Sequence, residues 1–475
     1  GYHPTRSFSP HVVESIPRLY RDAGASAIIG PPNIFFAEGR CVGGSTVING
    51  GMCYRPPPRV LDTWSELSDG RLSAASLEDR FREVEDDISA RPQLDLSIGD
   101  DNRIMATGAR RLGWQSEINN RNQDRCVGTN SCILGCPTGA KRSTLVTYIP
   151  RALAAGARVL TEVRVEKLWI ERDRCVGVIA RAIDPRTMRK SHPLRVRARA
   201  VVIACGAVQT PHLLLGAGPQ RRNRQLGRNF LCHPNAKVGA IYPDAVHAWQ
   251  GVNQFSQVRE FHEDGILFAE NFIPPAVIAV NLPAHGAASW DVMRRYDNMI
   301  LSGVLVEDSV AGRIHRGPFD VAVPRYRISA TDLERFKRGV RYLARLHLEM
   351  GADQLLLPFH SRPIVHRDEA IGAIDAVTDR SDIDLFTVHL MGTARMGPRR
   401  QDSVVDLNGQ LWDLPGCWVA DASLFPTAIG VNPQVTIMAL AQHVADHLDE
   451  TLARDDAGAA RRGVTQRAPR AGATG

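Results

Sequence analysis

Three short segments of the sequence combine residue types that bind ligands or move protons. Residues 39–52 are rich in glycine, which lets a backbone adopt positive φ and approach a ligand closely with its N–H groups free. His389 carries an imidazole, whose ordinary pKa of about 6.5 suits general-base catalysis, although an isolated histidine is more often only a satisfied polar residue. Asn432 precedes Pro433, and this pair on its own indicates a turn.

A group of cysteines raises a second chemistry. Cys126, Cys132 and Cys136 follow the spacing C-x5-C-x3-C-P, which invites comparison with iron–sulfur sites. No fourth ligand lies nearby and the spacing departs from the ferredoxin pattern, so we predict structural thiols and no metal. A disulfide between one pair of cysteines is an alternative that the sequence leaves open.

The elements that must position these residues follow an α/β pattern. Apolar, β-rich segments predict strands at residues 158–160, 163–165, 175–180, 200–204 and 418–421. The fourth of these ends at Cys205, and a leucine-rich helical stretch opens at Thr210. Residues 435–448 predict a terminal helix.

The region from residue 235 to about residue 375 has a different character. It contains scattered prolines and aromatic residues, and residues 320–323 alternate as a strand does. Residues 332–346 place apolar side chains at helical spacing. We interpret this region as a second, α+β domain that holds the substrate.

Length, charge and cysteine content exclude several classes of protein. At 475 residues the chain exceeds the ~250–300 residues of a single core, so at least two cores or an elaborated α/β architecture are expected. The net charge of +7 comes partly from the Arg-rich tail, so no nucleic-acid partner is predicted. No segment reaches the ~18 apolar residues of a transmembrane helix. Nine cysteines without dense pairing favour a cytoplasmic location.

The glycine-rich segment resembles the first signature of the glucose-methanol-choline (GMC) oxidoreductases. The similarity lies in Gly43-Gly44-Ser45 and Asn49-Gly50-Gly51-Met52. Residues 205–215 resemble the second signature, while Asp421-Ala422 and residues 430–437 resemble the C-terminal flavin contact. The matches follow the family's order from about Phe36 to Leu448, and the cholesterol oxidase and long-chain alcohol oxidase branch is the most similar.

This resemblance implies a flavoenzyme that oxidises an alcohol. Hydride would pass from the carbinol carbon to flavin N5, with His389 as the general base and Asn432 orienting the alcohol oxygen. Ile48 occupies the place where some relatives carry a histidine bonded to the flavin, so the FAD is expected to be non-covalent. The residues implied in cofactor binding are Gly43, Gly44, Ser45, Asn49, Gly50, Met52, Val165, Gly206, Asp421, Ala422, Pro433 and Gln434.

The resemblance also indicates substrates and a division into domains. It favours apolar primary or secondary alcohols, such as fatty alcohols or sterols, with oxygen or a quinone-like compound as electron acceptor. Residues 1–234 and 381–452 are assigned to an FAD-binding, Rossmann-like domain, and residues 235–380 to the substrate-binding domain. Residues 453–475 are assigned to a disordered basic tail.

The sequence departs from the family at its start. The strand, G-x-G-x-x-G turn and helix that bind the pyrophosphate, and the acid that binds the ribose, have no counterpart before Gly1. The first β-α-β unit is therefore interpreted as missing, and the 475-residue chain is expected to be poorly soluble and to lack bound FAD. An inactive fragment, a subunit completed by a partner chain and a non-oxidative lyase of this family are alternative interpretations.

Overall fold

The computed structural model describes residues 1–218, 223–271, 274–282, 284 and 286–465. Its largest sheet follows the order β1-β2-β18-β10-β13-β12-β11-β4, with β16 beside β10 and β17 beside β16. All neighbours in this sheet are antiparallel except β2 and β18, which are parallel. The strands are β1 (Ser26–Ile28), β2 (Ile34–Phe36), β4 (Ser116–Ile118), β10 (Asn235–Ile241), β11 (Ser256–Val258), β12 (Ile266–Glu270), β13 (Met299–Val306), β16 (Gln354–Leu356), β17 (Ile364–His366) and β18 (Leu385–Thr387).

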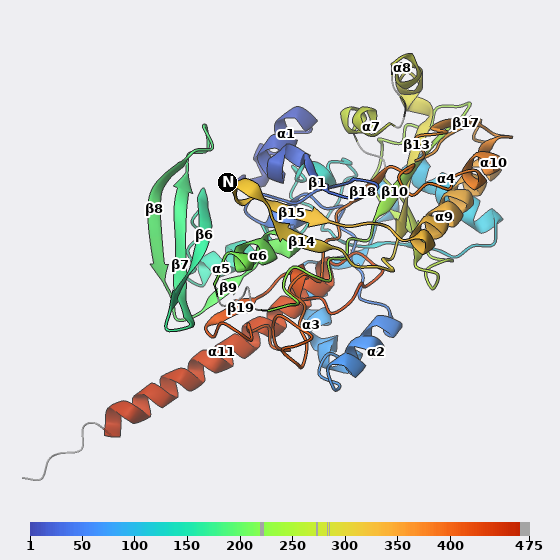
Figure 1. Cartoon of the computed structure of the whole chain (residues 1–475). Helices are drawn as coiled ribbons and strands as arrows, with labels where there is room; N and C mark the ends of the chain where they lie inside the picture. Colours follow the sequence, from blue (N-terminus) through green and yellow to red (C-terminus); the bar gives the residue numbers. More distant parts are fainter. Residues whose placement is uncertain (219–222, 272–273, 283, 285, 466–475) are drawn as a thin grey trace, which may run out of the picture.

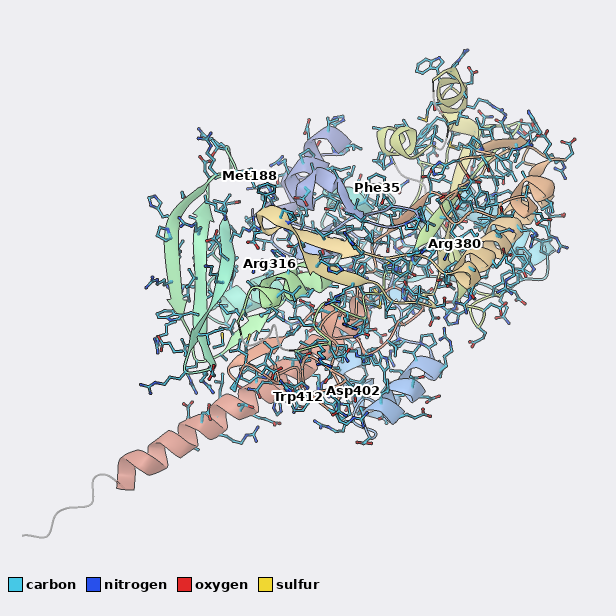
Figure 2. All side chains as sticks on the ribbon, viewed as in Figure 1. Phe35, Met188, Arg316, Arg380, Asp402 and Trp412 are labelled. Atoms are coloured by element: carbon cyan, nitrogen blue, oxygen red, sulfur yellow. The ribbon has the colours of Figure 1, made fainter. Side chains whose placement is uncertain are left out.

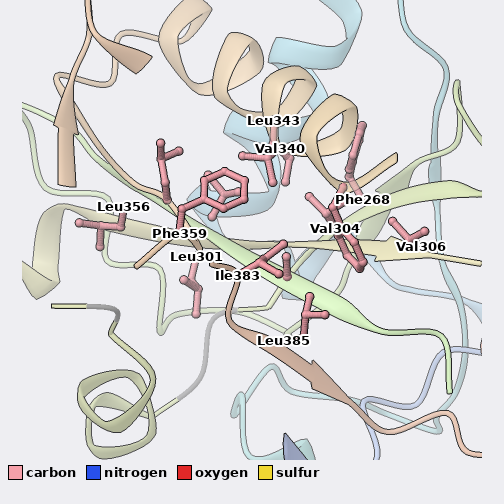
Figure 3. Close-up of a cluster of buried hydrophobic side chains, with 14 of the residues drawn as sticks. Phe268, Leu301, Val304, Val306, Val340, Leu343, Leu356, Phe359, Ile383 and Leu385 are labelled. Carbon is pink, nitrogen blue, oxygen red and sulfur yellow. The ribbon is translucent and has the colours of Figure 1, made fainter. Parts of the chain in front are cut away.

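One face of the large sheet carries the first hydrophobic core. Helix α9 (Ala330–Glu349) lies across this face, as Figure 3 shows, with α4 (Asp100–Arg111) and α10 (Ala370–Asp375) next to it. A capping box starts α9, because the side chains of Ser329 and Asp332 each accept from the other's backbone N–H. Gly339 of this helix has no room for a Cβ, which would lie 2.5 Å from Val304 on β13. Helix and sheet are thus in direct contact.

The second core lies around a short parallel pair of strands. β9 (Val201–Ile203) pairs with β19 (Cys417–Val419), and α6 (Gly206–Leu215) follows β9. The long helix α11 (Gln434–Thr465) contacts α3 (Ala74–Asp87), and α2 (Pro58–Leu67) contacts α3 in turn. Within this core the Trp64 and Phe425 rings meet edge to face at 5.7 Å between centroids. The cores together satisfy the expectation from chain length.

Smaller sheets and helices surround the two cores. β6 (Val163–Glu171), β7 (Arg174–Ile183) and β8 (Lys190–Arg197) form an antiparallel sheet that projects at one side of the molecule in Figure 1. Two further antiparallel pairs are β14 (Arg313–Arg316) with β15 (Ala322–Arg325), and β3 (Ala90–Pro92) with β5 (Asn120–Asn122). The remaining α-helices are α1 (Val12–Leu19), α5 (Tyr148–Ala154), α7 (Pro275–Asn281) and α8 (Ala287–Met293).

The mixture of helices and strands agrees with the predicted α/β class, but several boundaries differ. Residues 158–160 are not a strand, and α6 begins at Gly206 rather than at Thr210, with Pro211 inside it. α11 continues to Thr465, so the segment expected to be a disordered tail from residue 453 is helical over its first part. Residues 466–475 lie outside the described part of the chain.

The large sheet also crosses the predicted domain boundaries. β1, β2, β4 and β18 join a sheet whose other strands fall within residues 235–380. Figure 2 shows Phe35 of β2 near the middle of the molecule, and the backbone of this residue is paired in register with that of Phe386 of β18. None of the described helices is long and apolar enough to cross a membrane.

The contact between α9 and the sheet predicts the effect of a core substitution. Phe336 is completely buried in the first core, so Phe336→Ala removes apolar contacts and leaves a cavity. We expect the free energy of unfolding to fall by about 3–5 kcal/mol, measured by urea denaturation followed by circular dichroism. Arg345→Ala, at an exposed position of the same helix, is the control. Equal effects of the two substitutions would contradict the packing described for α9.

Candidate functional site

The glycine-rich segment forms a tight loop whose backbone is open to a ligand. Gly39 donates its N–H to Ser45 Oγ at 3.0 Å, and a Cβ on Gly39 would lie 2.5 Å from the backbone of Gly44. Gly44 itself has φ +55°, and a Cβ there would meet no atom within 4 Å. The close approach explains the glycine at 39, and the positive φ favours the glycine at 44. The open space beside Gly44 leaves room for a bound group.

The buried side chain of Lys141 holds the glycine-rich loop in place by hydrogen bonds. Lys141 Nζ donates to three carbonyl oxygens, those of Val47 at 2.7 Å, Asn49 at 2.8 Å and Cys132 at 2.6 Å. An ammonium group has three donors, so all of them are used. Burial lowers the pKa of Lys141 to about 8. Lys141 was not predicted from the sequence, because a single lysine after the cysteine cluster belongs to no motif or periodic pattern.

The cysteines before Lys141 are free thiols in the structure. Arg121 donates to Cys132 Sγ at 3.2 Å, and the backbone N–H of Lys141 donates to Cys136 Sγ at 3.2 Å. Cys126 lies close enough to Cys132 that the two thiols interact electrostatically. The disulfide considered as an alternative in the sequence is not formed in the structure. Cys132 and Cys136 pack next to Lys141, which contacts the glycine-rich loop.

The amide of Gln434 joins this loop to the start of α11. Asn49 Nδ2 donates to Gln434 Oε1 at 2.8 Å, and Gln434 Nε2 donates to the Met52 carbonyl at 2.7 Å. Three residues predicted to bind the cofactor therefore meet, although Gln434 is far from the other two in sequence. Asn49 Oδ1 is buried and accepts no hydrogen bond among the described residues, so it is available to a ligand donor.

A second group of predicted cofactor residues meets at the carboxyl ends of β9 and β19. The backbone N–H of Gly206 donates to Asp421 Oδ2 at 2.9 Å, and that of Ser423 donates to Asp421 Oδ1 at 2.8 Å. Glu38 lies beside Gly206, and burial raises its pKa to about 7. Ligands commonly bind at this edge of parallel strands.

Val165 stands apart from both groups. It is on β6, paired with Ala180 of β7, and its side chain is 38% exposed. β6 contacts α6, which begins at Gly206, but no hydrogen bond joins Val165 to the glycine-rich loop in the described part of the chain. Its predicted role stays a prediction.

The two predicted catalytic residues are in contact. Asn432 Nδ2 lies 3.2 Å from His389 Nε2, and because an amide NH2 group only donates, Nε2 accepts in this orientation. His389 Nδ1 is buried without a partner among the described residues. Burial is the main cause that lowers the pKa of His389 to about 3, and the nearby His233 and Lys237 lower it further. His389 is therefore a neutral imidazole at neutral pH.

His233 and a half-buried ion pair support the loop that carries Asn432. The Gly430 N–H donates to His233 Nε2 at 3.2 Å, and the His233 ring meets the His389 ring edge to face at 5.8 Å between centroids. Arg59 and Glu307 form a bidentate ion pair directly behind Gly430. These neighbours come from distant segments, so no local pattern in the sequence pointed to them.

The hydrogen bonds of Lys141 lead to a test of the loop's support. Lys141→Met leaves the carbonyls of Val47, Asn49 and Cys132 without their donor in a buried place. We expect the free energy of unfolding to fall by about 3 kcal/mol or more, measured by urea denaturation. Lys167→Met, at an exposed lysine of β6, is the control. A Lys141 variant as stable as this control would show that the loop does not need the lysine.

Comparison with known proteins extends the picture to whole chains. Two family models for GMC oxidoreductases match residues 16–235 and 310–441. An uncharacterized GMC-type oxidoreductase of Mycobacterium tuberculosis is 34% identical over 440 residues, which cover 92% of this chain and 69% of that protein. A long-chain-alcohol oxidase of Arabidopsis thaliana is 26% identical, over 95% of this chain and 63% of that protein.

A solved structure has the same fold. Pyridoxine 4-oxidase from Mesorbium loti superimposes with a TM-score of 0.70 at 18% identity, over 95% of this chain and 93% of that one. The family and the fold class expected from the sequence are thereby confirmed. The chain belongs to the GMC oxidoreductase family of FAD-dependent enzymes.

Proposed function

We propose that this protein oxidises an alcohol with FAD and that His389 removes the hydroxyl proton. The observation that carries the proposal is the 3.2 Å contact between Asn432 Nδ2 and a buried, neutral His389. A neutral imidazole can accept a proton, and an adjacent amide can hold the alcohol oxygen in place. The similarity to long-chain-alcohol oxidases supports the reaction class.

The residues around the glycine-rich loop fit a flavin. A flavin ring has both donors and acceptors, so the orphaned Asn49 Oδ1 can accept from one of its donors, and the open space beside Gly44 leaves room for the ring. When bound, FAD supplies the acceptor for the hydride. We assign its ring to Gly43, Gly44, Ser45, Asn49, Gly50, Met52, Pro433 and Gln434, and the rest of the cofactor to Val165, Gly206, Asp421 and Ala422.

The attachment of FAD is proposed to be non-covalent. Ile48 is buried with Val47 and Leu145, and its alkyl side chain has no atom that could bond to a flavin. Binding therefore depends on hydrogen bonds such as those available at Asn49 and the loop backbone.

The proton path belongs to residues of this chain. His389 Nε2 faces Asn432, so an alcohol oxygen held by the Asn432 amide lies within reach of the imidazole nitrogen. Residues 235–380 are proposed as the substrate-binding domain. Their strands β10 and β13 contain the paired residues Lys237 and Gly303, and the charge of Lys237 acts on His389. We propose apolar primary or secondary alcohols as substrates and oxygen or a quinone-like compound as electron acceptor.

Replacement of the base tests the proposal. In the FAD-loaded protein, His389→Ala is expected to slow reduction of the flavin by alcohol by about 100-fold or more, because the proton acceptor is lost. The measurement is anaerobic stopped-flow absorbance at the flavin band. Bound FAD, counted from the absorbance ratio of each preparation, is the control for folding. An unchanged rate of flavin reduction would remove His389 from the reaction.

The lowered pKa of His389 predicts how the activity of the protein varies with pH. A base works when deprotonated, and a pKa lowered to about 3 keeps His389 neutral from about pH 5 upward. We therefore expect the His389-dependent part of kcat/KM to stay level between about pH 5 and pH 7. A loss of activity centred near the ordinary histidine pKa would contradict the buried, neutral state.

Asn432→Ala is expected to be less harmful than His389→Ala. The substitution removes the amide that orients the oxygen but leaves the base in place, so we expect a decrease in flavin reduction of about 10-fold. Asn432→Asp is a matched variant of the same size that lacks the NH2 donor. If Asn432→Ala reduces its flavin as fast as the unmodified protein, Asn432 does not belong to the site.

A further inference from the structure

Strand β10 has one face in the core and one face toward the candidate site. Ala236, Val238 and Ala240 are completely buried in the first core. Since side chains alternate along a strand, Asn235 and Lys237 point to the opposite face. Lys237 is directly opposite Gly303 of β13, and this glycine presents no side chain to cover the lysine.

This opposite face looks toward the glycine-rich loop. A Cβ on Gly303 would lie 2.6 Å from Asn271 Nδ2 and 3.1 Å from the Asn235 amide. Gln254 Nε2 donates to Asn271 Oδ1 at 2.9 Å, while Gln254 Oε1 lies against Gly50. A line of amides therefore connects β10 with the loop proposed to hold the flavin ring. Lys237 follows His233 by four residues, the His233 ring meets the His389 ring, and the charge of Lys237 contributes to the lowered pKa of His389.

The ammonium group of Lys237 makes no hydrogen bond or ion pair with any residue in the described part of the chain. Other buried or half-buried lysines have acceptors, since Lys141 binds three carbonyls and Lys337 contacts Glu334 and the Asp375 carbonyl. The Lys237 side chain is partly buried, and a partly desolvated ammonium without an acceptor is unfavourable. Burial accordingly lowers the pKa of Lys237 to about 7. An acceptor supplied by a ligand would relieve this cost.

We propose that Lys237 binds a carboxylate on the substrate, so that among the apolar alcohols proposed above the preferred substrates carry a carboxylate at the far end of the chain. The inference rests on the proposed function, because it assumes that the carbinol lies at His389. An ammonium group forms charge-assisted hydrogen bonds with a carboxylate, which are about twice as strong as those between neutral groups. The ring of His233 contacts that of His389, and Lys237 follows His233 by four residues, a backbone span of at most about 13 Å. A substrate with a short chain between its carbinol and its carboxylate can therefore reach both His389 and Lys237.

The test compares two substrates of equal chain length in the FAD-loaded protein, 6-hydroxyhexanoate and 1-hexanol. We expect the unmodified protein to favour the hydroxy acid in kcat/KM by about 10-fold or more, the effect of one charge-assisted hydrogen bond. Lys237→Met should abolish this ratio, mainly through KM, and Lys237→Arg should restore part of it. Lys167→Met, at an exposed lysine, should leave the ratio as it is. An equal ratio in the unmodified protein and Lys237→Met overturns the proposal.

A binding measurement separates this proposal from the proposed function. Hexanoate, which has no hydroxyl group, is titrated into the protein by calorimetry, and we expect Lys237→Met to weaken its binding by about 10-fold or more. This result holds even if no alcohol is oxidised, in which case the proposed function alone fails. Equal hexanoate binding by both proteins overturns the carboxylate site. A shifted flavin potential in Lys237→Met without any change in hexanoate binding also overturns it, and assigns Lys237 to the flavin.

Discussion

The candidate site depends on the hydrogen bonds of one amide, that of Gln434. Its side chain binds Asn49 and the Met52 carbonyl, and so connects the first turn of α11 with a loop near the opposite end of the chain. Asn432 lies two residues before this amide, so the same contact fixes the distance between the loop and the proposed catalytic pair, His389 and Asn432. Lys141 holds the loop from its other side. The loop, the helix and the proposed catalytic pair are thus positioned as one unit.

The two hydrophobic cores position different parts of this unit. The core around β9 and β19 fixes Gly206 and Asp421, while the core under α9 fixes β10 and the segment from His233 to Lys237. His389 follows β18, which belongs to the large sheet, and Asn432 precedes α11, which belongs to the second core. The contact between His389 and Asn432 therefore lies where the two cores meet, and burial there keeps the imidazole neutral.

The sequence predicted the parts of the site that have a local pattern. Gly43, Asn49, Asp421 and Gln434 stand in motifs, and in the structure the last three belong to hydrogen-bonded groups. α9 was predicted because its apolar residues repeat at helical spacing. Lys141, His233 and Lys237 were not predicted, since a single lysine or histidine has no periodic signal and its partners come from remote segments. The strand expected at residues 158–160 fails because apolar residues alone do not supply a pairing partner.

The central claim is that this chain removes hydride from a carbinol carbon beside His389 and Asn432. The most direct measurement is anaerobic mixing of the FAD-loaded protein with a primary alcohol, either unlabelled or deuterated at the carbinol carbon. We predict loss of the flavin absorbance band, slower with the deuterated alcohol, because the C–H bond breaks in that step. Absence of flavin reduction by any alcohol, or identical rates for both isotopologues under conditions where substrate binding is fast, would contradict it.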